Sequence, residues 1–337
     1  MNFAMWKKAL QVIPEVSKEE WDGLDIISRW LISTRAAVLV MTFISAALAG
    51  LFAWRDGSFS FAPWLALVFG LIMAHASNNI FNDYTDYVRG VDKDNYYRNI
   101  YGAQPIASGL LTKRQHLTYF AVTALLALFA GLYLIFANAN DSFIWILLAM
   151  GMFFVLFYTW PLKYIALGEV AVLLVWGPLM IGGGYYVLAH QWSWNVVLAC
   201  LPYALGVTTV IFGKHIDKLD KDKAKRIFTL PVVIGEKASR MAVLGMMIIP
   251  YFLTAYLIAT KFFSPVMAIV LFAIPRFLKI YPIFLKPKPE TAPEGQLGWP
   301  LYFVGYAFYN NRYFGSLFML GLLVDVALRI FLPTFWR

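Results

Sequence analysis

Residues 64–92, WLALVFGLIMAHASNNIFNDYTDYVRGVD, join a strongly apolar segment to a cluster of amide and carboxylate side chains. A helix that begins near Trp64 and continues past Ala74 places these polar residues at three- and four-residue intervals on one face. They are Asn79, Asn82, Asp83 and Asp86. Their oxygens suit a hard divalent cation, because Mg²⁺ is commonly bound by one or two carboxylates together with substrate phosphates. The stretch therefore predicts a magnesium site at the end of an apolar helix.

The composition of the chain places this helix in a membrane. Of the 337 residues, 61% are hydrophobic and only 14% are charged. A spanning helix needs about 20 mostly apolar residues, and the stretches that approach this length are 31–54, 63–82, 116–136, 143–160, 166–187, 195–213, 241–260, 262–285 and 314–333. The aromatic run 302–309 fits the last span, a re-entrant piece or an interfacial helix. We predict an all-α polytopic membrane protein with about nine transmembrane helices around a central cavity.

The basic residues are divided unequally between the two sets of loops. With the N-terminus inside, 24 of the 28 Lys and Arg residues fall in inner segments, and the four outer ones are Arg55, Lys261, Arg329 and Arg337. Cytoplasmic loops are enriched in Lys and Arg. This predicts a cytoplasmic N-terminus in the cell inner (plasma) membrane, with the acidic clusters facing the cytoplasm. The net charge of +9 then reflects topology and attraction to anionic lipid and substrate, not nucleic acid.

Residues 1–30 are predicted to form an N-terminal interfacial segment ahead of a transmembrane domain at 31–337. Lys7 and Lys8 are not followed by an uninterrupted apolar core, which argues against a secretory signal. The run 17–20, Ser-Lys-Glu-Glu, has the pattern of a capping box. The single helix that it would start carries four apolar residues on one side: Trp21, Leu24, Ile27 and Leu31.

A second acidic cluster follows another apolar segment. It comprises Asp217, Asp220 and Asp222, which lie among Lys214, Lys218, Lys221, Lys223, Lys225 and Arg226. Taken alone, the basic run fits a solvated cytoplasmic loop, but beside the first carboxylate cluster it predicts a diphosphate held through metal. The first cluster has its own structural alternative, a plain helix C-terminus, although acids there oppose the helix dipole. In the last span, Asp325 and Arg329 are four residues apart and are expected to pair.

From about Trp30 to Met241 the chain resembles the UbiA superfamily of intramembrane prenyltransferases. The motifs that carry the resemblance occur in order: Ser33-Thr34-Arg35, Asn82-Asp83-x-x-Asp86, Pro105–Gly109, Tyr158, Lys163, Gly168–Val172, Gly177-Pro178, and Thr229-Leu230-Pro231 after the second cluster. The segments Asp86–Asp92 and Gly168–Val172 are most similar to the 1,4-dihydroxy-2-naphthoate polyprenyltransferases of menaquinone synthesis. Lys214 and His215 depart from that pattern, because an Asn-Asn pair commonly occupies these places.

The resemblance implies Mg²⁺-dependent transfer of a polyprenyl group from an allylic polyprenyl diphosphate to an aromatic acceptor, within membrane lipid. The implied metal ligands are Asn82, Asp83, Asp86, Asp217, Asp220 and Asp222. The implied substrate-binding residues are Arg35, Asn79, Lys163, Lys225 and Arg226. Tyr158 would stabilise the allylic cation and joins Asp83, Asp86, Asp217 and Asp220 as a catalytic residue. We further expect Asp83 and Asp86 at a solvated loop edge, so that their replacement leaves stability unchanged.

Other acceptors and other classes of protein stay open at this point. The alternative acceptors are 4-hydroxybenzoate, homogentisate, a chlorophyllide-like alcohol and a lipid glycerol phosphate. A secondary transporter would carry its ionisable groups near the bilayer midplane, whereas the clustered acids here follow the ends of spans. A non-catalytic membrane subunit would leave the paired Asp clusters unexplained. The sequence does not determine the acceptor, the prenyl chain length or the oligomeric state.

Overall fold

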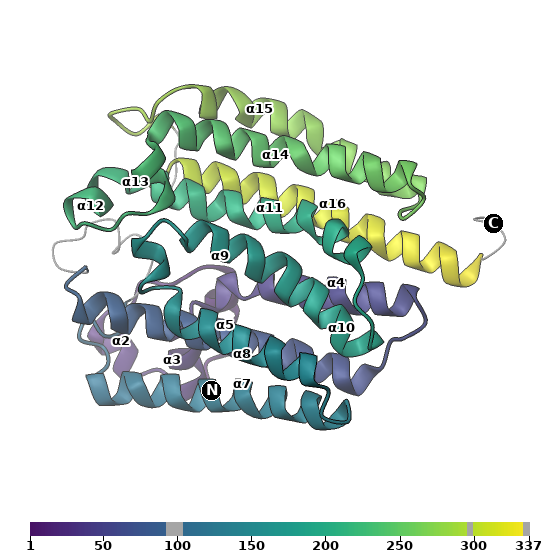
Figure 1. The fold of residues 1–337 in the computed structure, drawn as a ribbon. Coiled ribbons are helices and arrows are strands. Elements are labelled where there is room, and N and C mark those ends of the chain that lie inside the picture. The colour runs from purple at the N-terminus through teal and green to yellow at the C-terminus, as the bar shows by residue number, and fades with distance from the viewer. Residues whose placement is uncertain (92–103, 295–298, 333–337) are drawn as a thin grey trace. The chain divides into compact units, whose positions relative to one another are not determined.

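The computed structural model describes residues 1–91, 104–294 and 299–332, and these ranges contain helices and no β-strand (Figure 1). Within them, 8 helices are long and apolar enough to cross a membrane: Ala36–Arg55, Phe61–Val88, Lys113–Ala137, Gly168–Ala189, Trp194–Asp217, Glu236–Ala259, Pro265–Leu285 and Phe303–Phe331. A further apolar helix, α8 (Ser142–Phe157), is shorter. The all-α polytopic prediction is confirmed, with α8 at the place of the remaining predicted span. The aromatic run 302–309 belongs to the last span.

The chain packs as two compact units. The first comprises Met1–Phe43 and Leu65–Pro161, and the second comprises Ile44–Trp64 and Leu162–Arg337. The first unit holds α1 (Phe3–Gln11), α2 (Lys18–Asp22), α3 (Ile26–Ser33), the 3₁₀ turn η1 (Ala36–Val38), most of α5 (Phe61–Val88), α7 (Lys113–Ala137) and α8. The second holds most of α4 (Val40–Arg55), η2 (Leu162–Tyr164), α9 (Gly168–Leu174), η3 (Val175–Gly183), α10 (Gly184–Ala189), α11 (Trp194–Asp217), α12 (Leu219–Ala224), α13 (Leu230–Ile234), α14 (Glu236–Ala259), η4 (Pro265–Ala273), α15 (Ile274–Leu285) and α16 (Phe303–Phe331).

The N-terminal segment forms three short helices. The predicted capping box is present, since the Ser17 hydroxyl accepts from the Glu20 N–H and the Glu20 carboxylate accepts from the Ser17 N–H. The prediction of one continuous helix from Ser17 is wrong, because α2 ends at Gly23 and α3 starts anew behind Asp25. As a result Ile27, expected on the buried side with Trp21, is 39% exposed.

Asp25 joins α1 to α3. Its carboxylate caps α3 by accepting from the Ile27 and Ser28 N–H groups, and it also accepts from the Asn2 N–H at 2.8 Å and the Trp6 indole at 3.1 Å. Burial acts to raise the pKa of this carboxyl, but the hydrogen bonds prevail and hold the pKa well below its usual range. An ionised Asp25 therefore anchors the start of the chain.

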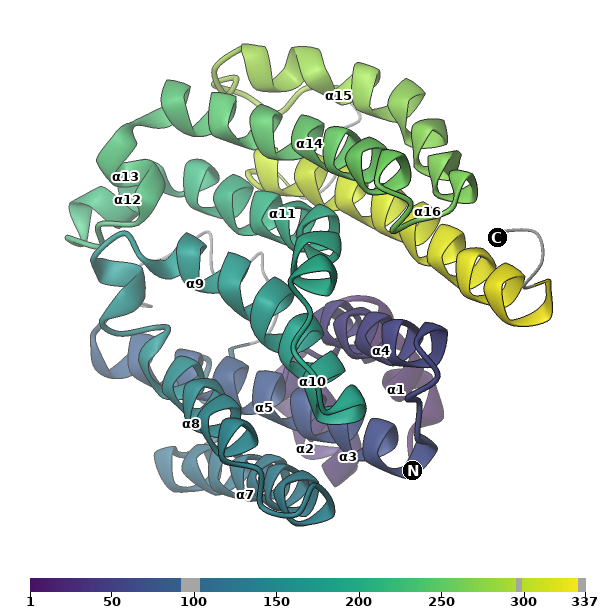
Figure 2. The ribbon, with the colours of Figure 1, turned by 45° about the vertical axis from the view of Figure 1, so that its right-hand side comes forward.

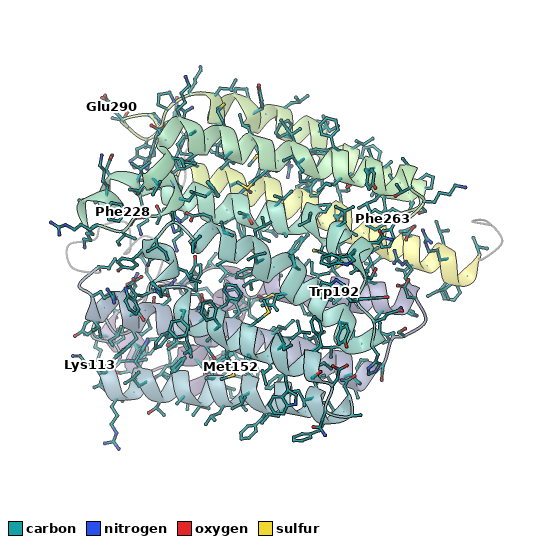
Figure 3. All side chains as sticks on the ribbon, viewed as in Figure 1. Lys113, Met152, Trp192, Phe228, Phe263 and Glu290 are labelled. Carbon is teal, nitrogen blue, oxygen red and sulfur yellow. The ribbon has the colours of Figure 1, made fainter. Side chains whose placement is uncertain are left out.

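The long helix α5 carries the first acidic cluster toward its end. It has 28 residues, about 42 Å at 1.5 Å per residue, which exceeds a hydrocarbon core of about 30 Å. In the neighbouring helix α7, only 17% of the most apolar 18-residue stretch is buried inside the protein. On α8, the Met152 side chain is 46% exposed (Figure 3). An outward face this apolar is suited to lipid.

In the second unit α11 packs against both α14 and α16 (Figures 1 and 2). Together with α15 they form a core that includes Phe212, Val243, Phe284 and Phe303. The start of α16 approaches α11 at Gly213, where an added Cβ would lie 2.8 Å from the Val304 nitrogen. A glycine is therefore required for this close approach, which brings the end of α11 against the N-terminus of α16.

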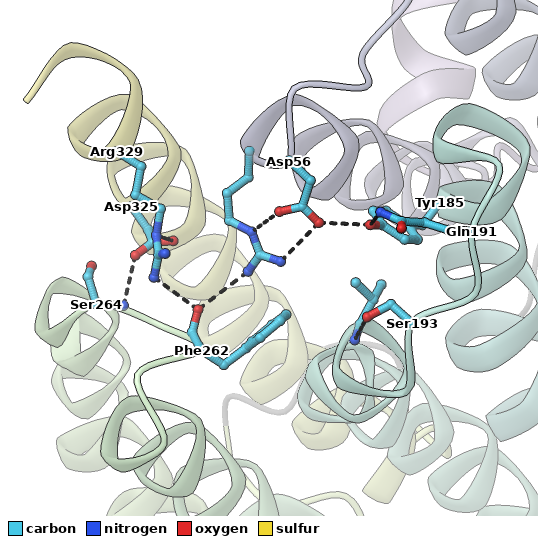
Figure 4. Close-up of polar contacts among 10 residues, drawn as sticks. Asp56, Tyr185, Gln191, Ser193, Phe262, Ser264, Asp325 and Arg329 are labelled. Atoms are coloured by element: carbon cyan, nitrogen blue, oxygen red, sulfur yellow. Dashed lines mark hydrogen bonds and ion pairs between the residues drawn. The ribbon is translucent and has the colours of Figure 1, made fainter. Parts of the chain in front are cut away.

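A polar network joins chain segments of the second unit near the end of α16 (Figure 4). Asp325 pairs with Arg329 at 3.1 Å, which confirms the expected pair. Arg55 pairs with Asp56 at 2.8 Å, and both arginines donate to the Phe262 carbonyl, at 3.4 Å from Arg55 and 3.0 Å from Arg329. Each of these two cations thus has a carboxylate partner inside the unit.

Candidate functional site

The four polar residues predicted to share one face of α5 are all buried there. Asp83 and Asp86 are 0% exposed, and Asn79 and Asn82 are 8% exposed. The expectation that Asp83 and Asp86 lie at a solvated loop edge is therefore wrong, because α5 continues to Val88 and encloses them in helix. Burying carboxylates carries a free-energy cost unless cations or hydrogen bonds compensate it. The site must therefore be built around partners for these groups.

Arg35 is the partner of Asp83. The two side chains form an ion pair, and the Arg35 side chain is only 11% exposed. Arg35 lies at the turn between α3 and η1 with φ of 53°, a left-handed conformation that is uncommon for a residue other than glycine. Asn79 fixes the same turn by donating its side-chain N–H to the Thr34 carbonyl at 2.8 Å. Two members of the cluster thus hold an arginine against α5.

The oxygen atoms of this cluster match the ligands that Mg²⁺ prefers. The Asn82 side-chain oxygen is buried and has no hydrogen-bond partner among the residues that the structure describes. Such an atom is rare unless an ion or water satisfies it. No three His, Cys, Asp or Glu side chains converge in the described ranges. A cation here would therefore draw on Asn82, Asp83 and Asp86 together with water or substrate oxygens.

The three acids of the second cluster differ in their surroundings. Asp217 is the last residue of α11 and is buried, Asp220 is exposed on α12, and Asp222 is buried 3.4 Å from the Lys218 ammonium. Asp217 and Asp222 lie next to different lysines, Lys288 and Lys218, and Asp220 differs from both in being exposed.

Asp217 caps the N-terminus of α16. Its two carboxylate oxygens accept from three successive backbone N–H groups, those of Tyr302, Phe303 and Val304, at 2.9, 3.0 and 3.0 Å. The Lys288 ammonium lies 3.6 Å away. Burial lowers the pKa of Lys288, while the Asp217 carboxylate acts to raise it. Unsatisfied N–H groups at a helix start favour an anion, so Asp217 has a structural role that its sequence pattern did not indicate.

This role predicts a stability effect for Asp217→Asn. The amide presents an NH₂ group to N–H donors, and leaving buried donors unsatisfied costs about 1–3 kcal/mol. We expect a melting temperature several degrees lower in nanodiscs, measured by tryptophan fluorescence. Asp220→Asn is the matched control because its side chain is exposed, and it should melt with the parent. Equal melting of Asp217→Asn and parent would contradict the capping role.

A buried Glu–His pair joins three segments of the second unit. Glu169, in the Gly168–Val172 motif, contacts the His215 Nδ1 at 2.5 Å and accepts from the Leu230 N–H at 3.3 Å. Glu169 and His215 are 1% and 2% exposed. The pair connects the start of α9, the end of α11 and the start of α13. His215, which departs from the Asn-Asn pair common in the naphthoate polyprenyltransferases, thus helps through Glu169 to position α13, the segment that follows the second acidic cluster.

The remaining predicted site residues have varied environments. Lys163 in η2 is 9% exposed, with its ammonium 5.7 Å from the Tyr164 ring. Lys225 is half-buried at the end of α12, and Arg226 is exposed with φ of 55°. Tyr158 is half-buried at the C-terminus of α8. The roles of these four residues stay predictions.

Sequence reasoning missed Lys288 and the backbone of residues 302–304 as partners of Asp217. The Tyr302 N–H that Asp217 binds is 85 residues away along the chain. Short-range periodicity carries no signal for such a contact. Only the position of Asp217 at the end of an apolar run suggested a special role.

The all-helical fold with 8 helices able to cross a membrane, together with a buried cluster of carboxylates, an amide oxygen and a paired arginine on α5, defines an integral membrane protein with a polar cluster inside one of its spans. The sequence profile of the UbiA prenyltransferase family matches residues 43–296. The chain belongs to this family.

Several known proteins are similar to the chain. It is 28% identical over 221 residues to the 1,4-dihydroxy-2-naphthoate octaprenyltransferase of Escherichia coli K12, covering 63% of this chain and 70% of that protein. It is 24% identical over 219 residues to a UbiA prenyltransferase domain-containing protein 1 homolog of Drosophila melanogaster, covering 64% of this chain and 59% of that protein. The match thus spans less than two thirds of the Drosophila relative.

Solved structures share the fold. A UbiA homolog from Aeropyrum pernix K1 superposes with a TM-score of 0.62 at 16% identity, covering 84% of this chain and 97% of that one. A UbiA homolog from Archaeoglobus fulgidus bound to GPP and Mg²⁺ gives a TM-score of 0.51 at 15% identity, covering 86% and 99%.

Proposed function

We propose that this protein transfers a polyprenyl group from an allylic polyprenyl diphosphate to an aromatic acceptor in a Mg²⁺-dependent reaction, with 1,4-dihydroxy-2-naphthoate as the acceptor. The observation that carries the proposal is the buried group on α5, where the Arg35–Asp83 pair lies one turn or less from Asp86 and the unsatisfied Asn82 oxygen. Polar and ionisable groups inside a span are costly and tend to mark functional sites, and four of them on one helix face support a binding role beyond the contacts of Asn79 and Asp83.

The residues of this cluster have different proposed roles in binding Mg²⁺ and the diphosphate. Asn82, Asp83 and Asp86 supply oxygen ligands for Mg²⁺. When bound, the metal would neutralise charge on the departing diphosphate as a Lewis acid. Arg35, with five N–H donors, can keep its contact with Asp83 and still donate to a phosphate oxygen. Asn79 holds the Arg35 turn in place.

The reaction balances without a further reactant. The allylic C–O bond breaks and its electron pair leaves with the diphosphate. The ring carbon of the acceptor then forms a C–C bond to the allylic carbon, and the carboxylate of a naphthoate acceptor leaves as carbon dioxide. An aromatic ring stabilises a nearby cation by about 0.5–2 kcal/mol, which is the role proposed for Tyr158. Lys163, Lys225 and Arg226 are proposed to attract the diphosphate.

We also propose a metal-binding role for the second acidic cluster, and the contacts of its three acids determine which of them are the better candidate ligands. Asp217 is already engaged by three N–H groups, whereas Asp220 is exposed and Asp222 lies 3.4 Å from the Lys218 ammonium. Asp220 and Asp222 are therefore the stronger candidate ligands of the three. The proposal places this chemistry at the cytoplasmic side of the cell inner membrane, following the bias of the basic loops.

Two relatives support the choice of reaction. The Escherichia coli relative is named for octaprenyl transfer to 1,4-dihydroxy-2-naphthoate, and the Archaeoglobus fulgidus homolog was solved with GPP and Mg²⁺. The departures at Lys214 and His215 keep 4-hydroxybenzoate, homogentisate, a chlorophyllide-like alcohol and a lipid glycerol phosphate as alternative acceptors.

An acceptor panel tests the function and the metal requirement together. Protein in nanodiscs is given a polyprenyl diphosphate and each acceptor in turn, and diphosphate release and prenylated product are measured. We expect product with 1,4-dihydroxy-2-naphthoate, loss of product with EDTA, and recovery when Mg²⁺ is added in excess. Product with only another acceptor would move the assignment to that acceptor. No diphosphate release with any acceptor would refute prenyl transfer.

A further inference from the structure

Three basic side chains lie on the two spans next to the loop 286–302. Arg276 is nine residues before Leu285, the end of α15, and Arg312 is nine residues after Phe303, the start of α16. At 1.5 Å per residue, each lies about 14 Å from its helix end. The 29 residues of α16 extend about 43 Å, about 13 Å more than a hydrocarbon core of about 30 Å, which leaves room for Arg312 at the head-group level on the inner side. Lys279 follows one turn after Arg276.

These three cations have no carboxylate partner in the part of the chain that the structure describes. Arg329, which also lies on α16, differs from them because it pairs with Asp325 at 3.1 Å. Lys279 and Arg312 are exposed, and Arg276 is half-buried. Ionisable residues inside a membrane normally pair with one another or face a polar partner. Two of these cations, Lys279 and Arg312, face outward, so an anion of the surrounding membrane can serve as the partner that the described residues do not supply.

Two tyrosines hold Arg276 in a fixed position. The guanidinium carbon lies 4.2 Å from the ring centroid of Tyr309 and 4.2 Å from that of Tyr313. These rings are one turn apart on α16, so they join α15 to α16 through cation–π contacts. Arg312 is three residues after Tyr309 and so lies on the same side of α16. The rings orient the guanidinium while its N–H groups stay available to donate.

We propose that the face formed by Arg276, Lys279, Tyr309, Arg312 and Tyr313 binds the phosphate head group of an anionic phospholipid. Its charge complements a phosphodiester, and basic pockets between membrane helices bind anionic head groups. A neighbouring outward residue, Leu278, is 59% exposed, which gives the acyl chains an apolar surface. Head-group phosphates lie at the edge of the hydrocarbon core, and long basic side chains near helix ends reach that level by snorkelling.

Lipid titration of purified, delipidated full-length protein tests this proposal. Native mass spectrometry would compare phosphatidylglycerol with phosphatidylcholine of the same acyl chains. We expect the parent to favour phosphatidylglycerol by tenfold or more. Arg276→Gln and Lys279→Gln should each weaken phosphatidylglycerol binding about fivefold, since one Lys or Arg contributes about that factor near anionic lipid. Lys279 is exposed, so its replacement should leave folding intact.

The control is Lys237→Gln, which removes an exposed cation from the first turn of α14 and should change phosphatidylglycerol binding less than twofold. Millimolar inorganic phosphate should not displace the lipid. Equal binding of the two lipids, unchanged binding in Lys279→Gln, or displacement by inorganic phosphate would each overturn the proposal. A dimer that Arg276→Gln abolishes, without any lipid preference, would assign the face to a second copy of the chain instead.

Discussion

Asp86→Asn and Asp83→Asn are each expected to lower prenyl transfer by about 100-fold or more. A metal that neutralises charge on the leaving group contributes several kcal/mol to the transition state, and 2.7 kcal/mol corresponds to about 100-fold in rate. Asn keeps the shape of Asp but is a neutral and weaker ligand. Both residues are 0% exposed, so an isosteric change removes the charge without opening a cavity. Asp83→Asn also removes the carboxylate partner of Arg35, so turnover is compared per folded molecule. The measurement is kcat and KM for the prenyl diphosphate over a range of Mg²⁺ concentrations.

A metal-ligand role also predicts how these variants respond to Mg²⁺. Their residual activity should need higher Mg²⁺ than the parent does. The matched control is Asp325→Asn, which alters an equally buried carboxylate in a span. It should lower stability, because Arg329 loses its partner, while turnover per folded molecule stays near that of the parent. Activity above about a tenth of the parent in either cluster variant would reject the metal-ligand role for that residue.

The parts of the fold that were predictable from the sequence depend on local patterns. The apolar run before Asn79 and the three- and four-residue spacing of Asn82, Asp83 and Asp86 predicted a long helix with one polar face, and α5 has this form. The Asp325–Arg329 pair followed from i,i+4 spacing and is present at 3.1 Å. Such features need only neighbours along a single helix.

Breaks in helices were harder to predict because two local signals competed. The capping box at Ser17 correctly predicted the start of α2, and the apolar residues beyond it suggested that the helix continues. Gly23 and the capping carboxylate of Asp25 instead end α2 and start α3. Asp25 is a good N-cap within the apolar periodic stretch, and it satisfies N–H groups at the start of a new helix. This capping outweighed the apolar periodicity.

The surroundings of the site residues depended on contacts distant in sequence. Asp83 was predicted to be a metal ligand, but its pairing with Arg35 joins residues 48 positions apart. Asp217 and Asp220 looked equivalent in the sequence, yet one caps α16 and the other is exposed. Residue type indicated which groups matter chemically. Only the tertiary fold determined which oxygens are already occupied by hydrogen bonds.

Arg35→Lys is expected to lower kcat/KM for the prenyl diphosphate about 10- to 100-fold while leaving the protein folded. Lysine can still pair with Asp83 as a point charge, so the buried carboxylate keeps a cation. A compact ammonium cannot, however, serve Asp83 and a phosphate oxygen with the planar fork of a guanidinium. The left-handed turn at Arg35 costs the same for either side chain, since neither is glycine.

The control for this substitution is Arg29→Lys in the same α3 region. Arg29 donates to the carbonyls of Trp21 and Asp22, at 3.1 and 2.8 Å, and so has a structural role. Its replacement should lower the melting temperature slightly and leave the KM for the prenyl diphosphate unchanged. Arg35→Lys should do the opposite, with the melting temperature of the parent and a raised KM for the prenyl diphosphate. Parental kinetics in Arg35→Lys, together with destabilisation in Arg35→Gln, would reduce Arg35 to a structural counter-ion of Asp83, because only the charge and not the fork would then matter.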